Sequence, residues 1–164
     1  MDKKTVICVD KDKNEHEVDV KDLVWRPSVY GVYIQDEKIL LSKQWDGYDF
    51  PGGGIDIHET IDEALRREFF EETGMNIESL GKIVECKSSF YKPTSNKYKS
   101  PINSVLVYYI IEKASGKLSI ENIAENEQEY LDMPEWIPLS EIENLKFYNS
   151  IDSVSIINKA VALI

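Results

Sequence analysis

The chain has 164 residues, of which 42% are apolar and 10% aromatic, and this composition suits one globular domain spanning residues 1–164. Its net charge of −11 argues against a duplex nucleic acid partner, because binding one requires clustered Lys and Arg side chains. The longest apolar run, 104–111, is too short to span a membrane, and no signal-peptide pattern is present. We therefore expect a soluble cytoplasmic protein, and a small anionic substrate stays open, because bound divalent cations can reverse the local charge.

The N-terminal residues 1–23 predict a β-hairpin. Two strand-like runs, 5–9 and 15–20, flank a polar turn at 10–14. Cys8 lies in the first of these runs, and the second cysteine, Cys86, lies in another apolar alternation. We expect both to be buried free thiols.

The clearest helix is predicted at 60–73. Thr60 and Glu63 form a capping box, and Gly74 has the place of the residue that ends a helix in the left-handed conformation. The order of strands and helices indicates a mixed α/β (α+β) domain with helices packed on a sheet. The other expected elements are strands at 28–34, 38–44, 82–87, 103–111 and 136–139, loops at 45–54, 88–102 and 121–134, a short helix at 141–145 capped by Ser140, and an amphipathic helix within 146–164.

Three glutamates share one face of the predicted helix, because Glu68, Glu71 and Glu72 are spaced i, i+3 and i+4. Such carboxylates repel one another, so the face is either solvated or bound to a hard cation. Mg²⁺ and Mn²⁺ take oxygen ligands, and Glu59 can return to the same site across the preceding turn. Arg67 can orient a carboxylate through bidentate hydrogen bonds, or form only an exposed ion pair.

The stretch from Gly53 to Met75, GGIDIHETIDEALRREFFEETGM, matches every specified position of the Nudix box. On these residues the chain resembles the Nudix hydrolase superfamily, over about Val24 to Leu145. The resemblance implies an α/β/α sandwich around a mixed sheet, with the box as loop, helix and loop. It also implies Mg²⁺- or Mn²⁺-dependent hydrolysis of a nucleoside diphosphate linked to another moiety, in a nucleoside triphosphate, a nucleotide sugar or a dinucleoside polyphosphate.

The resemblance also implies roles for the residues of the box. Arg67 would orient a glutamate, Glu71 and Glu68 would take part in catalysis, and the metal ligands would be Glu68, Glu71, Glu72, Glu59 and the carbonyl of Gly52. The general base varies among relatives, so it stays open among Glu68, Glu125, Glu127 and Glu129, with Glu127 preferred in the loop. We expect His58 to be an exposed turn residue.

The substrate residues are less determined by the sequence. Loop aromatics can stack on a base or close the edge of a core, and the candidates are Trp45, Tyr48, Phe50, Phe90 and Tyr91, of which we select Trp45, Phe50 and Tyr91. The terminal helix can complete the fold of a monomer or form a homodimer. The alternative to an enzyme is a non-catalytic Nudix domain that senses a nucleotide or binds a partner.

Overall fold

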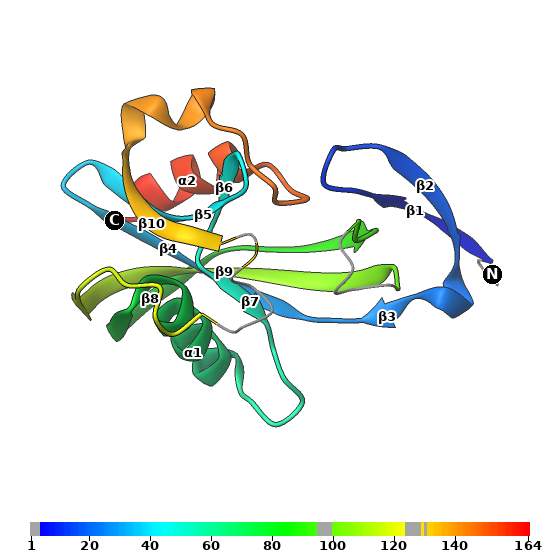
Figure 1. Ribbon diagram of the computed structural model, residues 1–164, viewed down its shortest axis with the longest axis horizontal. Helices are drawn as coiled ribbons and strands as arrows, with labels where there is room; N and C mark the ends of the chain where they lie inside the picture. The colour runs from blue at the N-terminus through cyan, green and yellow to red at the C-terminus, as the bar shows by residue number, and fades with distance from the viewer. Residues whose placement is uncertain (1–3, 95–99, 124–128, 130) are drawn as a thin grey trace.

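The computed structural model describes residues 4–94, 100–123, 129 and 131–164. Within them, ten strands form one curled, mixed sheet in the order β10-β5-β4-β9-β8-β1-β2, while β3, β6 and β7 pair with β9, β5 and β4 (Figure 1). The strands are β1 (Thr5–Val9), β2 (Glu15–Asp19), β3 (Val24–Trp25), β4 (Ser28–Gln35), β5 (Lys38–Gln44), β6 (Gly47–Asp49), β7 (Gly52–Gly54), β8 (Met75–Tyr91), β9 (Ile102–Gly116) and β10 (Leu131–Pro138). The helices are α1 (Ile61–Thr73), α2 (Ser153–Val161) and the short 3₁₀ helices η1 (Val20–Asp22) and η2 (Leu139–Asn144).

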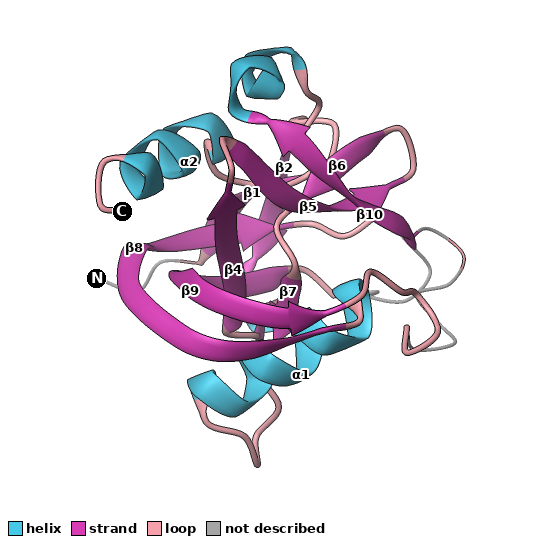
Figure 2. Cartoon of the chain, turned by 90° about the vertical axis from the view of Figure 1, so that its left-hand side faces the viewer, coloured by secondary structure: helices cyan, strands magenta, loops and turns pink. Residues whose placement is uncertain are grey.

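Helices α1 and α2 lie on opposite faces of the sheet, as the expected α/β/α sandwich requires (Figure 2). Strand β4 shows how the sequence builds both layers, because successive side chains of a strand point to opposite faces. Val29 and Tyr33 pack with Phe69 of α1, whereas Val32 packs with Ile156 of α2. The C-terminal helix therefore completes the core of this chain.

Helix α1 has the predicted ends. Thr60 is the N-cap, its side chain and that of Glu63 form the reciprocal capping box, and Gly74 ends the helix in the left-handed conformation with φ 74°. Glycine adopts this conformation without the steric cost of a side chain. The backbone N–H of Gly74 donates a hydrogen bond to Phe70 O at 2.8 Å. These local signals fix where the box helix begins and ends.

Parts of three predicted loops are strands. In the predicted loop 45–54, β6 pairs with the end of β5, and β7 pairs with the start of β4. Strand β8 continues to Tyr91 because it keeps pairing with the long strand β9, from Ser88 opposite Val105 to Tyr91 opposite Ile102. Strand β10 likewise begins at Leu131, inside the predicted acidic loop, because it pairs with β5.

Two smaller predictions are wrong. The short helix is a 3₁₀ helix that begins after Pro138, and no side chain caps it, so Ser140 is not its cap. Cys8 is buried but Cys86 is exposed, as are the next two residues of β8. Among the described residues, no helix is long and apolar enough to cross a membrane.

Candidate active site

Arg67 connects the turn before α1 with the acidic face of that helix. Its Nε and Nη2 atoms lie 2.6 and 2.8 Å from the two oxygens of Glu59. Its Nη1 atom lies 2.9 Å from Glu68 Oε1 and 3.4 Å from Glu71 Oε2. The guanidinium lowers the pKa of Glu59 to about 2, and the carboxylates raise the pKa of Arg67. Arg67 is thus a shared counterion for three of the predicted glutamates.

Glu72 is held separately, by residues that precede the helix. Its side chain is buried, and its Oε2 atom accepts hydrogen bonds from Ser42 Oγ at 2.5 Å and from the backbone N–H of Gly52 at 3.2 Å. Burying a carboxylate is costly unless donors satisfy it. Ser42 on β5 and Gly52 on β7 supply those donors, so Glu72 faces the glycine-rich entry to the box.

Two glycines at the entry to the box leave room for groups that approach them closely. A Cβ on Gly53 would lie 2.7 Å from the Glu68 carboxylate, which is itself buried. Gly52 has φ +148°, and a Cβ there would lie 2.2 Å from Val29 O. Glycine at these positions lets Glu68 and Glu72 approach the turn directly.

The donor set suits a hard divalent cation, since Glu68, Glu71 and Glu72 offer carboxylate oxygens, and those of Glu68 and Glu72 lie beside Gly53 and Gly52. In the described structure, the ligand atoms of these three glutamates do not all lie within 4.8 Å of one another. Arg67 contacts two of them, and a cation of higher charge would compete with it. The set that does meet this criterion comprises the loop residues Asp56, His58 and Glu59, of which the first two are exposed.

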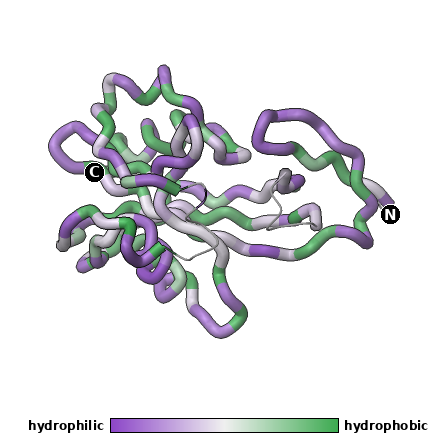
Figure 3. The backbone as a smooth tube through the Cα atoms, viewed as in Figure 1, coloured by the Kyte–Doolittle hydropathy of each residue, from purple (hydrophilic) through white to green (hydrophobic). Residues whose placement is uncertain are grey.

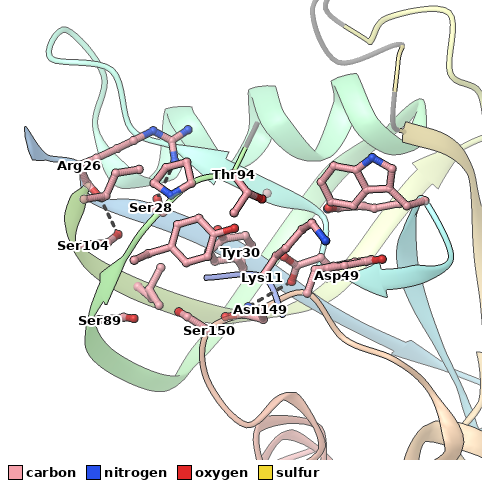
Figure 4. Close-up of a pocket in the computed structure, with 18 of the residues that line it drawn as sticks. Lys11, Arg26, Ser28, Tyr30, Asp49, Ser89, Thr94, Ser104, Asn149 and Ser150 are labelled. Atoms are coloured by element: carbon pink, nitrogen blue, oxygen red, sulfur yellow. Dashed lines mark hydrogen bonds between the residues drawn. The ribbon is translucent and has the colours of Figure 1, made fainter. Parts of the chain in front are cut away.

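A cavity of about 200 Å³ reaches Glu72 and Gly52. Tyr30, whose ring is stacked on Tyr108 at 5.2 Å between centroids, forms part of its wall. Figure 4 shows Arg26, Ser28 and Ser104 on one side of this cavity, and Lys11, Asp49 and Asn149 on the other.

The Asp49 carboxyl in this cavity accepts hydrogen bonds from the backbone N–H of Phe50 at 2.8 Å and from Asn149 Nδ2 at 3.1 Å. Burial raises the pKa of Asp49 to about 7. Asn149 Nδ2 also donates to the Tyr108 hydroxyl at 2.6 Å, which fixes the amide against the core. The cavity therefore contains a carboxyl group of raised pKa beside an oriented amide.

The predicted substrate aromatics have different environments. Trp45 and Tyr91 line the cavity, so their stacking roles stay predictions. Phe50 is 0% exposed and packs edge-on against Tyr108, so its face is closed to a ligand and that prediction is wrong. Phe90 packs against the hairpin core, and Tyr48 donates a hydrogen bond to Glu135.

The general base stays a prediction. Glu125 and the preferred Glu127 lie outside the described residues, and Glu129 is exposed. Glu68 is near Arg67 and beside Gly53, as described above. The sequence reasoning missed Ser42, Asp49, Asn149 and Lys11, because their side chains reach the site only through pairing of distant segments. Of these four residues, only Asp49 could have been suspected from the sequence, because it lies just before the glycine turn.

The fold and the site together define a mixed α/β domain with an acidic, arginine-linked helix beside a glycine turn and a small cavity. The family model described as NUDIX domain matches residues 24–156. This match covers most of the chain, and the chain belongs to the NUDIX family.

Two curated relatives are similar over part of their length. The chain is 39% identical over 69 residues to an oxidized purine nucleoside triphosphate hydrolase of Danio rerio, covering 37% of this chain and 42% of that protein. It is 29% identical over 112 residues to an ADP-ribose pyrophosphatase of Methanocaldococcus jannaschii, covering 65% of this chain and 61% of that protein. The alignments thus span less than two thirds of each relative.

A solved structure shows the same fold. The chain matches a MutT NUDIX hydrolase from Burkholderia pseudomallei with a TM-score of 0.59 and 17% identity, over 86% of this chain and 99% of that one. At this identity the likeness concerns the fold alone.

Proposed function

We propose that this protein is a metal-dependent hydrolase that cleaves the diphosphate bond of a nucleoside diphosphate linked to another moiety, with Mg²⁺ or Mn²⁺. The observation that carries the proposal is the placement of the acidic face of α1. Glu68 and Glu72 are buried beside Gly52 and Gly53, and the cavity begins at Glu72 and Gly52. A diphosphate held by a cation at these carboxylates would have its organic group in the cavity.

The residues of the site would have three roles: binding the cation, orienting its ligands and accepting a proton. Glu68, Glu71 and Glu72, with the Gly52 carbonyl, would hold the cation, which neutralises phosphate charge and lowers the pKa of a bound water. Ser42 and the Gly52 N–H orient Glu72, and Arg67 orients Glu59 and Glu68. A carboxylate in reach then accepts the proton of the attacking water. Glu68 and the loop residue Glu127 are the candidates for this acceptor.

The organic group is proposed to be a nucleoside or a sugar attached to the diphosphate. The names of both curated relatives describe derivatives of purine nucleotides, which supports a nucleotide substrate. A cavity of about 200 Å³ suits one ring system, because sites for drug-sized ligands measure about 300 to 1,000 Å³. We place the protein in the cytoplasm, as a monomer or homodimer.

The test is a screen of nucleoside triphosphates, dinucleoside polyphosphates and nucleotide sugars with Mg²⁺ or Mn²⁺ and analysis of products. Glu71→Gln and Glu72→Gln should each retain less than about a tenth of wild-type turnover, since each removes a charged ligand. Glu143→Gln, which changes an exposed glutamate in η2, should match the wild type. More than a tenth of wild-type turnover in the box variants would overturn the assigned roles.

Calorimetry separates this enzyme from a non-catalytic sensor. Tight nucleotide binding without any product in excess Mn²⁺ would favour the sensor. Divalent cations should also raise the melting temperature of the wild type more than that of Glu72→Gln, because binding to the folded state alone stabilises it.

A further inference from the structure

The N-terminal hairpin lies outside the matched family domain, which begins at residue 24, yet its turn reaches the cavity. Figure 1 shows β1 and β2 arching from one end of the sheet towards the segment before α2. Val9 pairs with Tyr91, and its carbonyl accepts a hydrogen bond from the Lys92 N–H at 3.0 Å. Lys13 Nζ donates to the Asn149 carbonyl at 2.5 Å. The hairpin is therefore tied to two segments that line the cavity, at Tyr91 and at Asn149.

The turn is also ordered from within. The Asp10 side chain is buried, and its Oδ1 atom accepts hydrogen bonds from the N–H groups of Asp12 and Asn14, both at 2.9 Å. Its Oδ2 atom lies 2.8 Å from His16 Nε2, and this contact is the largest cause that lowers the pKa of Asp10. In Figure 3 the turn is hydrophilic, while β1, which leads into it, is largely apolar. Hence this polar turn presents its lysine side chains from a preformed backbone.

Lys11 comes from this turn into the cavity wall, beside Asp49 and Asn149 in Figure 4. Its ammonium group donates to Asp12 Oδ2 at 2.7 Å. An ammonium group has three N–H donors, so this ion pair leaves donor capacity for a ligand. Asp12 already offsets the positive charge of the Lys11 ammonium group. We therefore expect Lys11 to donate a hydrogen bond to a neutral acceptor of the ligand and not to bind a second anion.

We propose that the hairpin turn is a specificity element of the cavity, and that Lys11 donates a hydrogen bond to a carbonyl oxygen or ring nitrogen of the ring system held there. This inference rests on the proposed function, because it presumes a nucleotide whose diphosphate lies at the box. The turn then limits what the cavity accepts, while the box carries out the chemistry.

The test compares Lys11 with Lys21, at the other end of the same hairpin. Each pairs with a nearby aspartate, Asp12 at 2.7 Å and Asp19 at 3.0 Å, but Lys21 is 75% exposed and is not part of the cavity wall. Lys11→Ala and Lys11→Met should raise KM for the best nucleotide substrate about tenfold with kcat changed less than about twofold, as loss of one charged hydrogen bond predicts. Lys11→Arg should restore most of the loss, and Lys21→Ala should behave as the wild type.

A ligand without a ring shows whether the effect is local. Pyrophosphate with Mg²⁺, used as a competitive inhibitor, should bind Lys11→Ala and the wild type equally, because it contains no group to reach Lys11. Equal KM values in Lys11→Ala and Lys21→Ala would overturn the inference. An equal loss of pyrophosphate binding would also overturn it, since it would indicate a general distortion.

Failure of the proposed function would be seen separately, as absence of hydrolysis by the wild type. Quenching of tryptophan fluorescence by the same nucleotides then tests the inference alone, since Trp45 lines the cavity. Weaker binding by Lys11→Met than by Lys21→Ala would support it. No binding by the wild type would overturn both proposals.

Discussion

Arg67 contacts both carboxylate oxygens of Glu59, at 2.6 and 2.8 Å, and so ties the turn before α1 to the acidic face of that helix. The Glu59 side chain is 10% exposed and that of Arg67 is 32% exposed. A partly buried bidentate pair of this kind is stronger than a surface ion pair. Because the same guanidinium contacts Glu68 and Glu71, it also separates carboxylates that would otherwise repel one another.

Arg67→Gln should lower the free energy of unfolding by about 1 to 3 kcal/mol, because it leaves Glu59 without its charged partner. It should also slow hydrolysis by releasing the glutamates that it orients. Urea unfolding and steady-state kinetics measure the two effects. Arg66→Gln is the matched control, because its i,i+4 pair with Asp62 is more exposed, and its kinetics should stay near wild type.

The same pair predicts a pH dependence. Arg67 lowers the folded-state pKa of Glu59 from its ordinary 4.5 to about 2, so the stability from this pair is present above pH 4.5. That stability is lost as the pH falls through 2. The stability difference between wild type and Arg67→Gln should therefore shrink on acidification from pH 6 to 3, and a constant difference would contradict this assignment.

Ser42→Ala should weaken the binding of the divalent cation and slow turnover, each about 10- to 100-fold. Losses of this size are typical when a residue that orients a metal ligand is removed. The reason is the 2.5 Å hydrogen bond from Ser42 Oγ to the buried Glu72. Calorimetric titration with Mn²⁺ and initial rates measure the effect. Ser79→Ala removes an exposed bond of similar length, 2.6 Å to Glu112, and should leave both quantities unchanged.

Gly53→Ala should reduce kcat, because the added Cβ would lie 2.7 Å from the Glu68 carboxylate and force it to move. In Gly81→Ala, by contrast, the nearest atoms are 3.1 Å away and belong to the flexible Glu112 side chain. That control should keep wild-type kinetics. Equal kcat values for the two variants would show that the position of Glu68 does not limit catalysis.

Asp49→Asn should become more stable relative to wild type as the pH rises from 5 to 8. Burial raises the folded-state pKa of Asp49 from its ordinary 3.8 to about 7, so folding favours the protonated form. The wild type therefore loses stability as the pH rises from about 3.8 to about 7, because over this range the folded state keeps a proton that the unfolded state has released, whereas asparagine stays neutral. Melting temperatures at both pH values measure this. Asp22→Asn, in the exposed turn η1, should show no such trend.

The parts of the site that depend on neighbours along the chain were predictable from the sequence. The spacing of Glu68, Glu71 and Glu72 places them on one helical face whatever the surroundings. The capping box of Thr60 and Glu63 and the left-handed Gly74 are likewise local, and the structure confirms them. The hairpin followed from two strand-like runs that flank a polar turn, and the structure pairs them.

What remained hidden depends on which distant segments the sheet brings together. Ser42 and Glu72 are 30 residues apart, and Lys13 and Asn149 are 136 residues apart, so no spacing rule connects them. Trp45 and Phe50 look alike in sequence, yet the sheet turns Phe50 into the core and leaves Trp45 at the cavity. The acidic helix and its glycine entry follow from residue spacing alone, because helical geometry is local. Which side chains face the cavity depends on the folded chain, because strand register and layer packing arise from contacts between distant segments.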